Sequence, residues 1–347
     1  MKKIFILIAI ASMTFCACNK SEIIENKEAA SFVASFDANT KTTLNNDKEL
    51  SQSWLGGEVV KVLDVTHASQ ITDPKKEEVK TCTFTNIGTK GPKATFVADN
   101  QSFEFVGGHN YFVYYGGTSD KSDQLSIVDK MHLGLKFSAA YLYNPTGKYG
   151  LSDNLIPLVS KFKYTGKASV QNIMFHNISS LLVLRVTNTS GEDKQVGYIR
   201  IGHLEQPEQP EKPKPSWRTH IFGGALPRYS KIDDYSDPST SYNFGGGSHA
   251  TNLATVSFSS PITIKNNETK DFAVCVVQPY SDESFDLTAQ IYNIQSGTIV
   301  ASAVKSGLSK TKLNGPGHTY VWSIDITSSK ATNVLNINPL GNNELAF

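Results

Sequence analysis

The feature that most constrains this chain is a series of short stretches in which every second side chain is apolar. Four of them follow one another in the first half, TCTFTNI, KATFVA, SFEFVG and NYFVYYGG, separated by Gly, Asn, Asp or Pro. Side chains two residues apart lie on the same face of a strand, so this period of two predicts β-strands. Short strands at regular spacing favour sandwiches over an α/β fold. We therefore predict an all-β protein, with residues 111–115, apolar on both faces, as a central strand.

The division of the chain follows from its length and from where the strand-like stretches group. A length of 347 residues exceeds one typical domain. Two blocks of strand-like sequence meet near residue 167, so we expect two tandem β-sandwich domains, 31–166 and 167–347. The second block opens with VQNIMFHNISSLLVLRV, in which Leu181–Val186 reads as a buried strand.

Two segments of the second block do not fit a sheet interior. The insert EQPEQPEKPKP, residues 205–215, is proline-rich and charged. Proline has no N–H to donate to a sheet, so this insert is expected to be an exposed polyproline loop. The tail, residues 331–347, holds one more strand-like stretch, in which Leu335 and Ile337 share a face opposite two asparagines.

The amino terminus has the organisation of a secretion signal. Lys2 and Lys3 precede twelve apolar residues, Ile4–Phe15. A bilayer-spanning helix needs about 20 such residues, so this run is expected to be a signal peptide and not a membrane anchor.

The end of that signal indicates a lipid attachment. The letters FCAC place the small residue Ala17 before Cys18, as in a bacterial lipobox. We predict that residues 1–17 are a lipoprotein signal peptide, that Cys18 is acylated, and that 18–30 is a polar tether. The alternative is an ordinary secretory signal cut near Ala17.

Charge and cysteine content narrow the classes of partner and chemistry. The 33 basic side chains are balanced by 32 acidic ones, so the chain offers no general attraction to nucleic acid.

Beyond Cys18, two cysteines remain, Cys82 and Cys275. They fall in different predicted domains, and their spacing matches no zinc or redox motif. We expect them to be small core residues and not a bridge.

The motifs of common enzymes are missing from the sequence. There is no GxSxG, HExxH, Walker A or dinucleotide-binding turn. The run FGGGSH does not lie between a strand and a helix, and the acidic runs DKSD and DDYSD lack the spacing of a calcium loop. We therefore predict no catalytic residue, no metal site, no cofactor and no enzymatic activity. Paired carboxylates, whose spacing is spatial, keep an uncharacterised enzyme as a third reading.

Four features in order along the chain resemble the fimbrillins, the lipoprotein pilins and pilin-like proteins of Bacteroidetes. They are the lipobox, the strand running into Thr40-Lys41-Thr42 with the later WLGGEVVKV, the pair NYFVYY and IPLV, and finally IMFHN followed by LLVL. The resemblance spans most of the chain after the signal peptide. It implies two transthyretin-like β-sandwiches on an outer-membrane lipoprotein that assembles with other pilin subunits into a fimbrium.

The resemblance also implies how assembly would occur. In such pilins a protease cuts after a basic residue near the first strand, and a strand of a neighbouring subunit fills the groove left behind. The matching position here is Lys41, and the candidate donor strand carries Leu335 and Ile337. The chain departs from the family in having no arginine before Arg185. An uncut, anchored or accessory subunit is therefore the favoured interpretation.

Aromatic side chains in long loops indicate an alternative function. Trp217, Tyr229 and Tyr235 lie in irregular stretches of the second block, where a sugar ring could stack on them. Glycan-binding lipoproteins of the same bacteria are also β-sandwiches behind a lipobox. The alternative function is therefore a glycan-binding outer-membrane lipoprotein, with a host or bacterial surface ligand.

Overall fold

The computed structural model confirms the all-β class. It describes residues 29–36, 54–66, 80–116, 125–129, 132–137, 139–151, 156–166, 171–204, 217–227, 250–279, 281–293, 297–313 and 317–327. Within these ranges the chain forms strands and the three-residue 3-10 turns η3 (Lys148–Gly150) and η4 (Trp217–Thr219), with no α-helix. None of these elements is a helix with the length and apolar character needed to cross a membrane.

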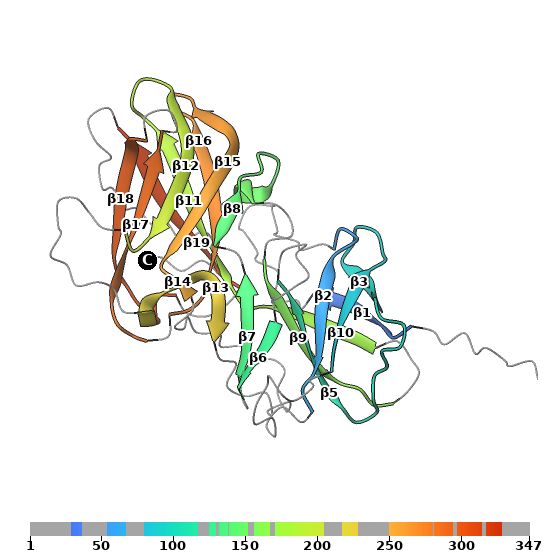
Figure 1. Ribbon diagram of the computed structural model, residues 1–347. Coiled ribbons are helices and arrows are strands. Elements are labelled where there is room, and N and C mark those ends of the chain that lie inside the picture. Colours follow the sequence, from blue (N-terminus) through green and yellow to red (C-terminus); the bar gives the residue numbers. More distant parts are fainter. Residues whose placement is uncertain are drawn as a thin grey trace, which may run out of the picture.

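Seven strands close into a barrel, which lies on the right in Figure 1. Their order around the barrel is β1 (Ser31–Phe36), β10 (Gln171–Asn177), β9 (Leu158–Lys163), β5 (Asn110–Tyr115), β2 (Val59–Asp64), β3 (Thr81–Asn86) and β4 (Lys93–Ala98), which returns to β1. Because every strand has a partner on both sides, this sheet has no free edge. The predicted sandwich is thus a closed sheet in the N-terminal part.

The larger body, on the left in Figure 1, is a sandwich of two sheets. One has the order β16 (Thr269–Val276), β11 (Ser180–Asn188) and β19 (Thr319–Ile326). The other has the order β18 (Ile299–Leu308), β17 (Phe285–Tyr292), β12 (Lys194–Gly202), β15 (Leu253–Ile264) and β8 (Ala140–Leu142). The inward side chains of both sheets form one apolar core.

A third sheet connects parts of the chain that lie far apart in sequence. Its order is β14 (Ala250–Thr251), β13 (Phe222–Pro227), β7 (His132–Phe137) and β6 (Leu125–Asp129). The segment between β5 and β9 therefore leaves the barrel, pairs with β13 through β7, and adds β8 to the edge of the sandwich beside β15. The sequence analysis placed this segment in the N-terminal domain.

Strand β10 also has partners that the sequence did not predict. It was expected to open the C-terminal domain, but it pairs in parallel with β1 and antiparallel with β9 inside the barrel. The chain passes into the sandwich just afterwards, at β11. The two-domain division at residue 167 remains a prediction, with β10 pairing on the N-terminal side.

Strand β5 is buried on both faces, as its apolar sequence predicts. Tyr111, Val113 and Tyr115 point into the barrel core, whereas Phe112 and Tyr114 belong to the core of the sandwich. The two bodies therefore share a continuous apolar contact through the outer face of this strand.

Candidate functional site

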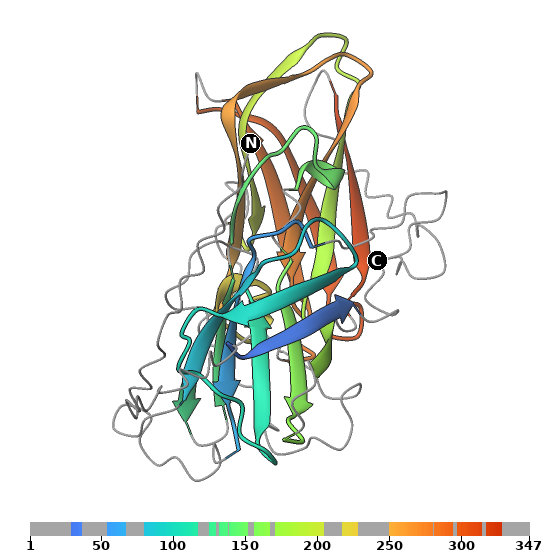
Figure 2. The same ribbon diagram turned by 90° about the vertical axis from the view of Figure 1, so that its right-hand side faces the viewer.

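The first strand, β1, is the element that closes the barrel. Five of its residues have register partners on β4, from Ser31 opposite Val97 to Ser35 opposite Lys93. Five residues, from Phe32 to Phe36, also have parallel partners on β10. Figure 2 shows β1, in dark blue, crossing the near side of the barrel. Without β1, the facing edges of β4 and β10 would each expose a row of backbone N–H and C=O groups.

The inward face of β1 rests on aromatic rings of the barrel core. Phe32 and Ala34 are fully buried, while Val33 and Ser35 on the outer face are partly exposed. The ring centroid of Phe32 lies 5.2 Å from that of Phe84 and 5.3 Å from that of Phe96. Burying one such phenylalanine contributes about 1.5–3 kcal/mol, so β1 covers an apolar groove that would otherwise face water.

Trp54 forms the end wall of this groove. Its ring stacks on that of Phe36, the last residue of β1, with centroids 4.8 Å apart. It meets Phe96 and Phe175 edge-on at 5.1 and 5.2 Å. Backbone hydrogen bonds of 2.9 Å in both directions between Trp54 and Gly91 hold it beside the β3–β4 turn. The seat of β1 is therefore built from β3, β4, β10 and this single bridge.

The turn after Trp54 explains why the sequence there reads Trp-Leu-Gly-Gly-Glu. The buried Glu58 carboxylate accepts hydrogen bonds from the backbone N–H of Leu55 and from that of Gly56, the latter at 3.0 Å. It also accepts one of 2.6 Å from the Asn86 side-chain amide. Gly56 has a φ of +100°, and a Cβ there would lie 2.7 Å from the Gly88 carbonyl oxygen, so only glycine fits.

A second polar cluster fixes the opposite end of β2. The Asp64 carboxylate accepts hydrogen bonds from the Thr66 hydroxyl at 2.7 Å and from the Thr66 N–H at 3.0 Å, and it lies 2.7 Å from Nδ1 of His109. Burial raises the pKa of Asp64, but the bonds from Thr66 and His109 outweigh burial and leave this pKa below its ordinary value of 3.8.

The sequence-predicted site residues lie almost entirely outside the described residues. This holds for Cys18, Lys41, Leu335 and Ile337, and for Tyr229 and Tyr235 of the glycan alternative. For Trp217 the structure gives the backbone, as the first residue of η4. The predicted roles of all seven therefore stay predictions.

The two remaining cysteines are buried and form no disulfide bond, as expected for core residues. Cys82 lies on β3 in the barrel and Cys275 on β16 in the sandwich. Burial raises the pKa of both thiols, that of Cys275 to about 11. Because the thiolate is the reactive form, burial disfavours nucleophilic reactivity of both thiols.

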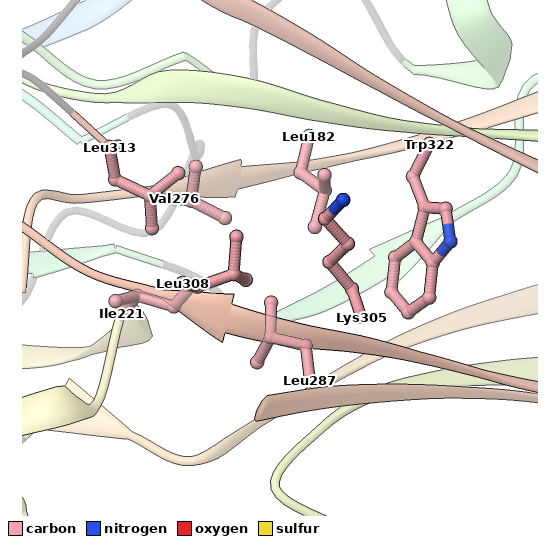
Figure 3. Close-up of a pocket in the computed structure, with 8 residues that line it drawn as sticks. All are labelled: Leu182, Ile221, Val276, Leu287, Lys305, Leu308, Leu313 and Trp322. Carbon is pink, nitrogen blue, oxygen red and sulfur yellow. The ribbon is translucent and has the colours of Figure 1, made fainter. Parts of the chain in front are cut away.

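The described residues hold no cluster of three or more His, Cys, Asp or Glu side chains placed to bind a metal ion. A small cavity lies inside the sandwich, where Lys305 extends among apolar side chains that include Leu182, Leu287 and Trp322 (Figure 3). Its volume of about 10 Å³ holds roughly one water molecule. Burial lowers the pKa of Lys305. A cavity of this size does not accommodate a sugar or a cofactor.

Sequence reasoning missed the side chains that form the seat of β1. The alternation identified Phe84 and Phe96 as inward-facing only in general, and gave no sign that they meet Phe32. The signal that could have indicated the turn was Glu58 itself, an acid directly before a buried strand and after two glycines. Such an acid has few ways to be buried except by accepting backbone N–H groups.

Comparisons with known proteins give structural neighbours only. No protein-family profile matches the sequence, and no curated protein matches it. A Bacteroides ovatus protein described as a "putative cell adhesion protein" is 10% identical, with 89% of this chain and 96% of that chain covered and a TM-score of 0.48. A Bacteroides uniformis protein with the same description is 12% identical, with 89% and 97% covered and a TM-score of 0.42.

A third neighbour is the tip fimbrial protein Mfa3 of Porphyromonas gingivalis, which is 9% identical. Here 89% of this chain and 98% of that chain are covered, with a TM-score of 0.33. Adhesion and fimbrial proteins are thus what this chain is similar to. At these identities and at TM-scores below 0.5, the likeness establishes neither a common fold nor a common function.

Proposed function

We propose that this protein is a structural and adhesive surface lipoprotein of fimbrillin type, a subunit or anchor of a fimbrium that joins other subunits by β-strand exchange at the seat of β1. One observation carries the proposal. The first strand of the fold is hydrogen-bonded on both sides and closes a barrel over an aromatic groove. No other strand precedes β1 in the part of the chain that the structure describes, so β1 can leave the groove without unthreading a described element.

The physical basis is the exchange of one strand for another in the same groove. Removing β1 exposes the edges of β4 and β10 together with the rings of Phe84, Phe96 and Trp54. An extended segment with alternating apolar side chains restores both the backbone hydrogen bonds and the apolar burial. Residues 331–347, with Leu335 and Ile337, are the proposed donor in a neighbouring subunit.

In this proposal, acylated Cys18 attaches the protein to the outer membrane. Whether β1 stays in its groove or is removed then decides the role of the subunit. A cut after Lys41 would release β1 and the lipid together and give a polymerising subunit. An uncut chain keeps β1 in its groove and stays attached, as an anchoring or accessory subunit. The lack of arginine before Arg185 supports the second form.

Strand exchange is tested with a variant that begins at Thr42 and therefore lacks β1. This variant is expected to form ladders of oligomers on native gels. A synthetic peptide with the sequence of Ser31–Phe36 should suppress the ladders, whereas a peptide of the same composition in scrambled order should not. Deleting residues 331–347 from the same variant should leave it monomeric.

Two results would contradict strand exchange. One is a folded, monomeric protein when the variant lacks β1, keeps residues 331–347 and is given no peptide. The other is a ladder that the peptide does not affect, because the groove would then play no part in the contact. A ladder that persists without residues 331–347 would exclude these residues as the donor.

The two forms are separated by the mature N-terminus, measured by mass spectrometry on protein from outer membranes and from shed filaments. An acylated peptide beginning at Cys18 in assembled material supports the anchored form and excludes cleavage. A terminus at Thr42 supports cleavage at Lys41. Replacement of Cys18 by alanine should release the protein from the membrane fraction if this residue carries the lipid.

A further inference from the structure

The outer face of the five-stranded sheet carries a row of side chains that the proposed assembly does not use. The register places Leu142 of β8 beside Ser257 of β15, Ser257 beside Tyr198 of β12, Tyr198 beside Tyr292 of β17, and Tyr292 beside Ile299 of β18. Leu142 and Ile299, at the two ends of the row, are 56% and 42% exposed. The residues that alternate with this row, such as Ile199 and Val256, point into the sandwich core.

The two tyrosines in the middle of the row form a preset aromatic pair. Their ring centroids are 4.4 Å apart and their planes 16° apart, so the rings stand side by side on the sheet. The Tyr292 hydroxyl donates a 2.5 Å hydrogen bond to the Gln290 side chain, which fixes the ring. On the other side of the pair lies Ser257, a small and exposed residue between Tyr198 and Leu142, and we call this stretch of the outer face the notch. Strands are about 4.8 Å apart, so this notch is about 10 Å across from strand to strand.

Arg200 supplies a positive charge at the same place. Its guanidinium carbon lies 5.3 Å from the ring centroid of Tyr198 and 5.6 Å from that of Tyr292. These nearly equal distances put the guanidinium at the shared edge of the pair and not on the notch-facing side of Tyr198. The neighbours of Arg200 across the sheet are Thr255 and Gln290, which are both uncharged.

This arginine differs from the others in the part of the chain that the structure describes. Arg185 makes a two-pronged ion pair with Asp271, at 2.9 and 3.0 Å, and Arg218 lies 3.9 Å from Glu283. Arg200 has no acidic partner among the described residues, and its guanidinium lies against the two tyrosine rings. An exposed guanidinium held on aromatic faces keeps its donors free for a carboxylate, which it can bind in two-pronged fashion.

We propose that Tyr198, Tyr292 and Arg200 form a binding site for a glycan that ends in a carboxylate-bearing sugar. The apolar face of the sugar ring packs on Tyr198 in the notch, and the carboxylate binds Arg200. The Ser257 hydroxyl donates a 3.2 Å hydrogen bond to the Tyr141 carbonyl oxygen and can still accept one from a sugar hydroxyl. Thr255, two residues earlier on β15, offers a second hydroxyl. Because the two rings are already held in place, binding a sugar costs little side-chain conformational entropy. This site lies on a different surface from the loop aromatics of the sequence-based alternative, and it does not depend on strand exchange.

The experiment measures binding to the chain from Asn19 to Phe347 by isothermal calorimetry and by saturation-transfer NMR. The probes are 3′-sialyllactose, a disaccharide ending in glucuronate, and neutral lactose. We expect at least one acidic probe to bind about tenfold or more tightly than lactose, with a preference that weakens in 0.5 M salt. The two acidic probes distinguish a sialic acid from a uronic acid as the natural end group.

Variants assign the binding to this site. Arg200→Gln should remove the preference for the acidic probe, Arg200→Lys should keep part of it, and Tyr198→Ala should weaken every sugar about tenfold. Lys90→Gln, which removes a positive charge from an exposed turn of the barrel, should bind like the unmodified chain. Equal affinity for lactose and both acidic probes would overturn the proposal. So would undiminished preference in Arg200→Gln, or equally tight binding of an oligoglutamate peptide, which would indicate a general anion patch.

Discussion

Among single residues, Glu58 shows most clearly how one buried side chain organises the candidate site. Its carboxylate receives two backbone N–H groups and the Asn86 amide inside the Trp54 turn. A buried carboxylate is stable only when such donors surround it. Trp54 is the end wall of the β1 groove. Glu58 therefore affects the groove indirectly, because it holds the turn that positions Trp54.

Replacing Glu58 by glutamine tests this dependence. The new amide nitrogen would face backbone N–H donors, so at least one buried donor loses its acceptor. We expect the free energy of unfolding to fall by about 1–3 kcal/mol, measured by urea denaturation with an unchanged m-value. Glu283→Gln, on an exposed loop of the sandwich, is the matched control and should change stability by less than about 0.5 kcal/mol. Equal effects of the two substitutions would show that the carboxylate does not hold the turn.

Asp64 predicts a dependence of stability on acid. Its pKa in the folded protein lies below the ordinary value of 3.8, so the ionised carboxylate stabilises the fold at and above about pH 4. This contribution is lost as the pH falls through the folded-state pKa. Urea denaturation between pH 2.5 and 6 should therefore show a smaller acid-induced loss in Asp64→Asn than in the unmodified chain. Asp282→Asn, on an exposed loop, should keep the full loss, and identical pH profiles for all three proteins would refute the role of Asp64.

Among the elements, β1 separates a buried face from a partly exposed one. Phe32 and Ala34 are buried against the groove, and the residues between them are partly exposed. A donor strand with the same alternation can replace the backbone hydrogen bonds of β1 and the side chains of its buried face. Exchange therefore requires that most of the binding energy of β1 come from these two sources.

A pair of substitutions measures how much each face contributes. Phe32→Ala leaves a cavity between Phe84 and Phe96 and should lower the free energy of unfolding by about 3–5 kcal/mol. Val33→Ala, one residue along on the outer face, should cost less than about 1 kcal/mol. Hydrogen exchange in β4 and β10 should accelerate in the first variant only. Similar costs for both substitutions would mean that β1 does not depend on its groove.

The elements also show what the sequence could predict and where prediction stopped. Alternation identified strands β3, β4 and β5 at nearly the observed bounds, and the two-sided apolar run of β5 predicted its central position. The fourth stretch, SFEFVG at residues 102–107, was wrongly predicted, because it lies between β4 and β5 and forms no strand. Alternation reports which face of a strand is buried, but it carries no information on which strand lies alongside. Alternation therefore could not predict two contacts between distant segments. One is the parallel pairing of β10 with β1, and the other is the pairing of β8 with β15 of the sandwich.

The same limit applies to the candidate sites. The strand later identified as β1 could be recognised from SFVASF, because its pattern is local. The aromatic groove beneath it, and the row that joins Tyr198 to Tyr292 and Arg200, are assembled from different strands by register. Tyr198 and Arg200 are separated by one residue in sequence, but nothing local indicates that Tyr292 lies beside them.

At the scale of the whole molecule, the barrel and the sandwich are joined through β5. Tyr114 is completely buried in the contact, and its neighbours include the sandwich residue Cys275. Tyr141 of β8 accepts a 3.1 Å hydrogen bond from the Cys275 N–H in the same region. Such a contact limits rotation of one body against the other, because domains move independently unless the interface between them is large and apolar.

Substitution on the two faces of β5 tests whether this contact makes the molecule unfold as one unit. Tyr114→Ala removes a ring from the shared core, so we expect calorimetry to resolve two transitions where the unmodified chain shows one. Val113→Ala, on the face of β5 that points into the barrel, should keep the single transition but lower its melting temperature. Hydrogen exchange provides the complementary readout, since only Tyr114→Ala should let β2, β5 and β9 exchange ahead of β11 and β16. A single transition in Tyr114→Ala would show that the third sheet, through β7 and β13, suffices to couple the two bodies.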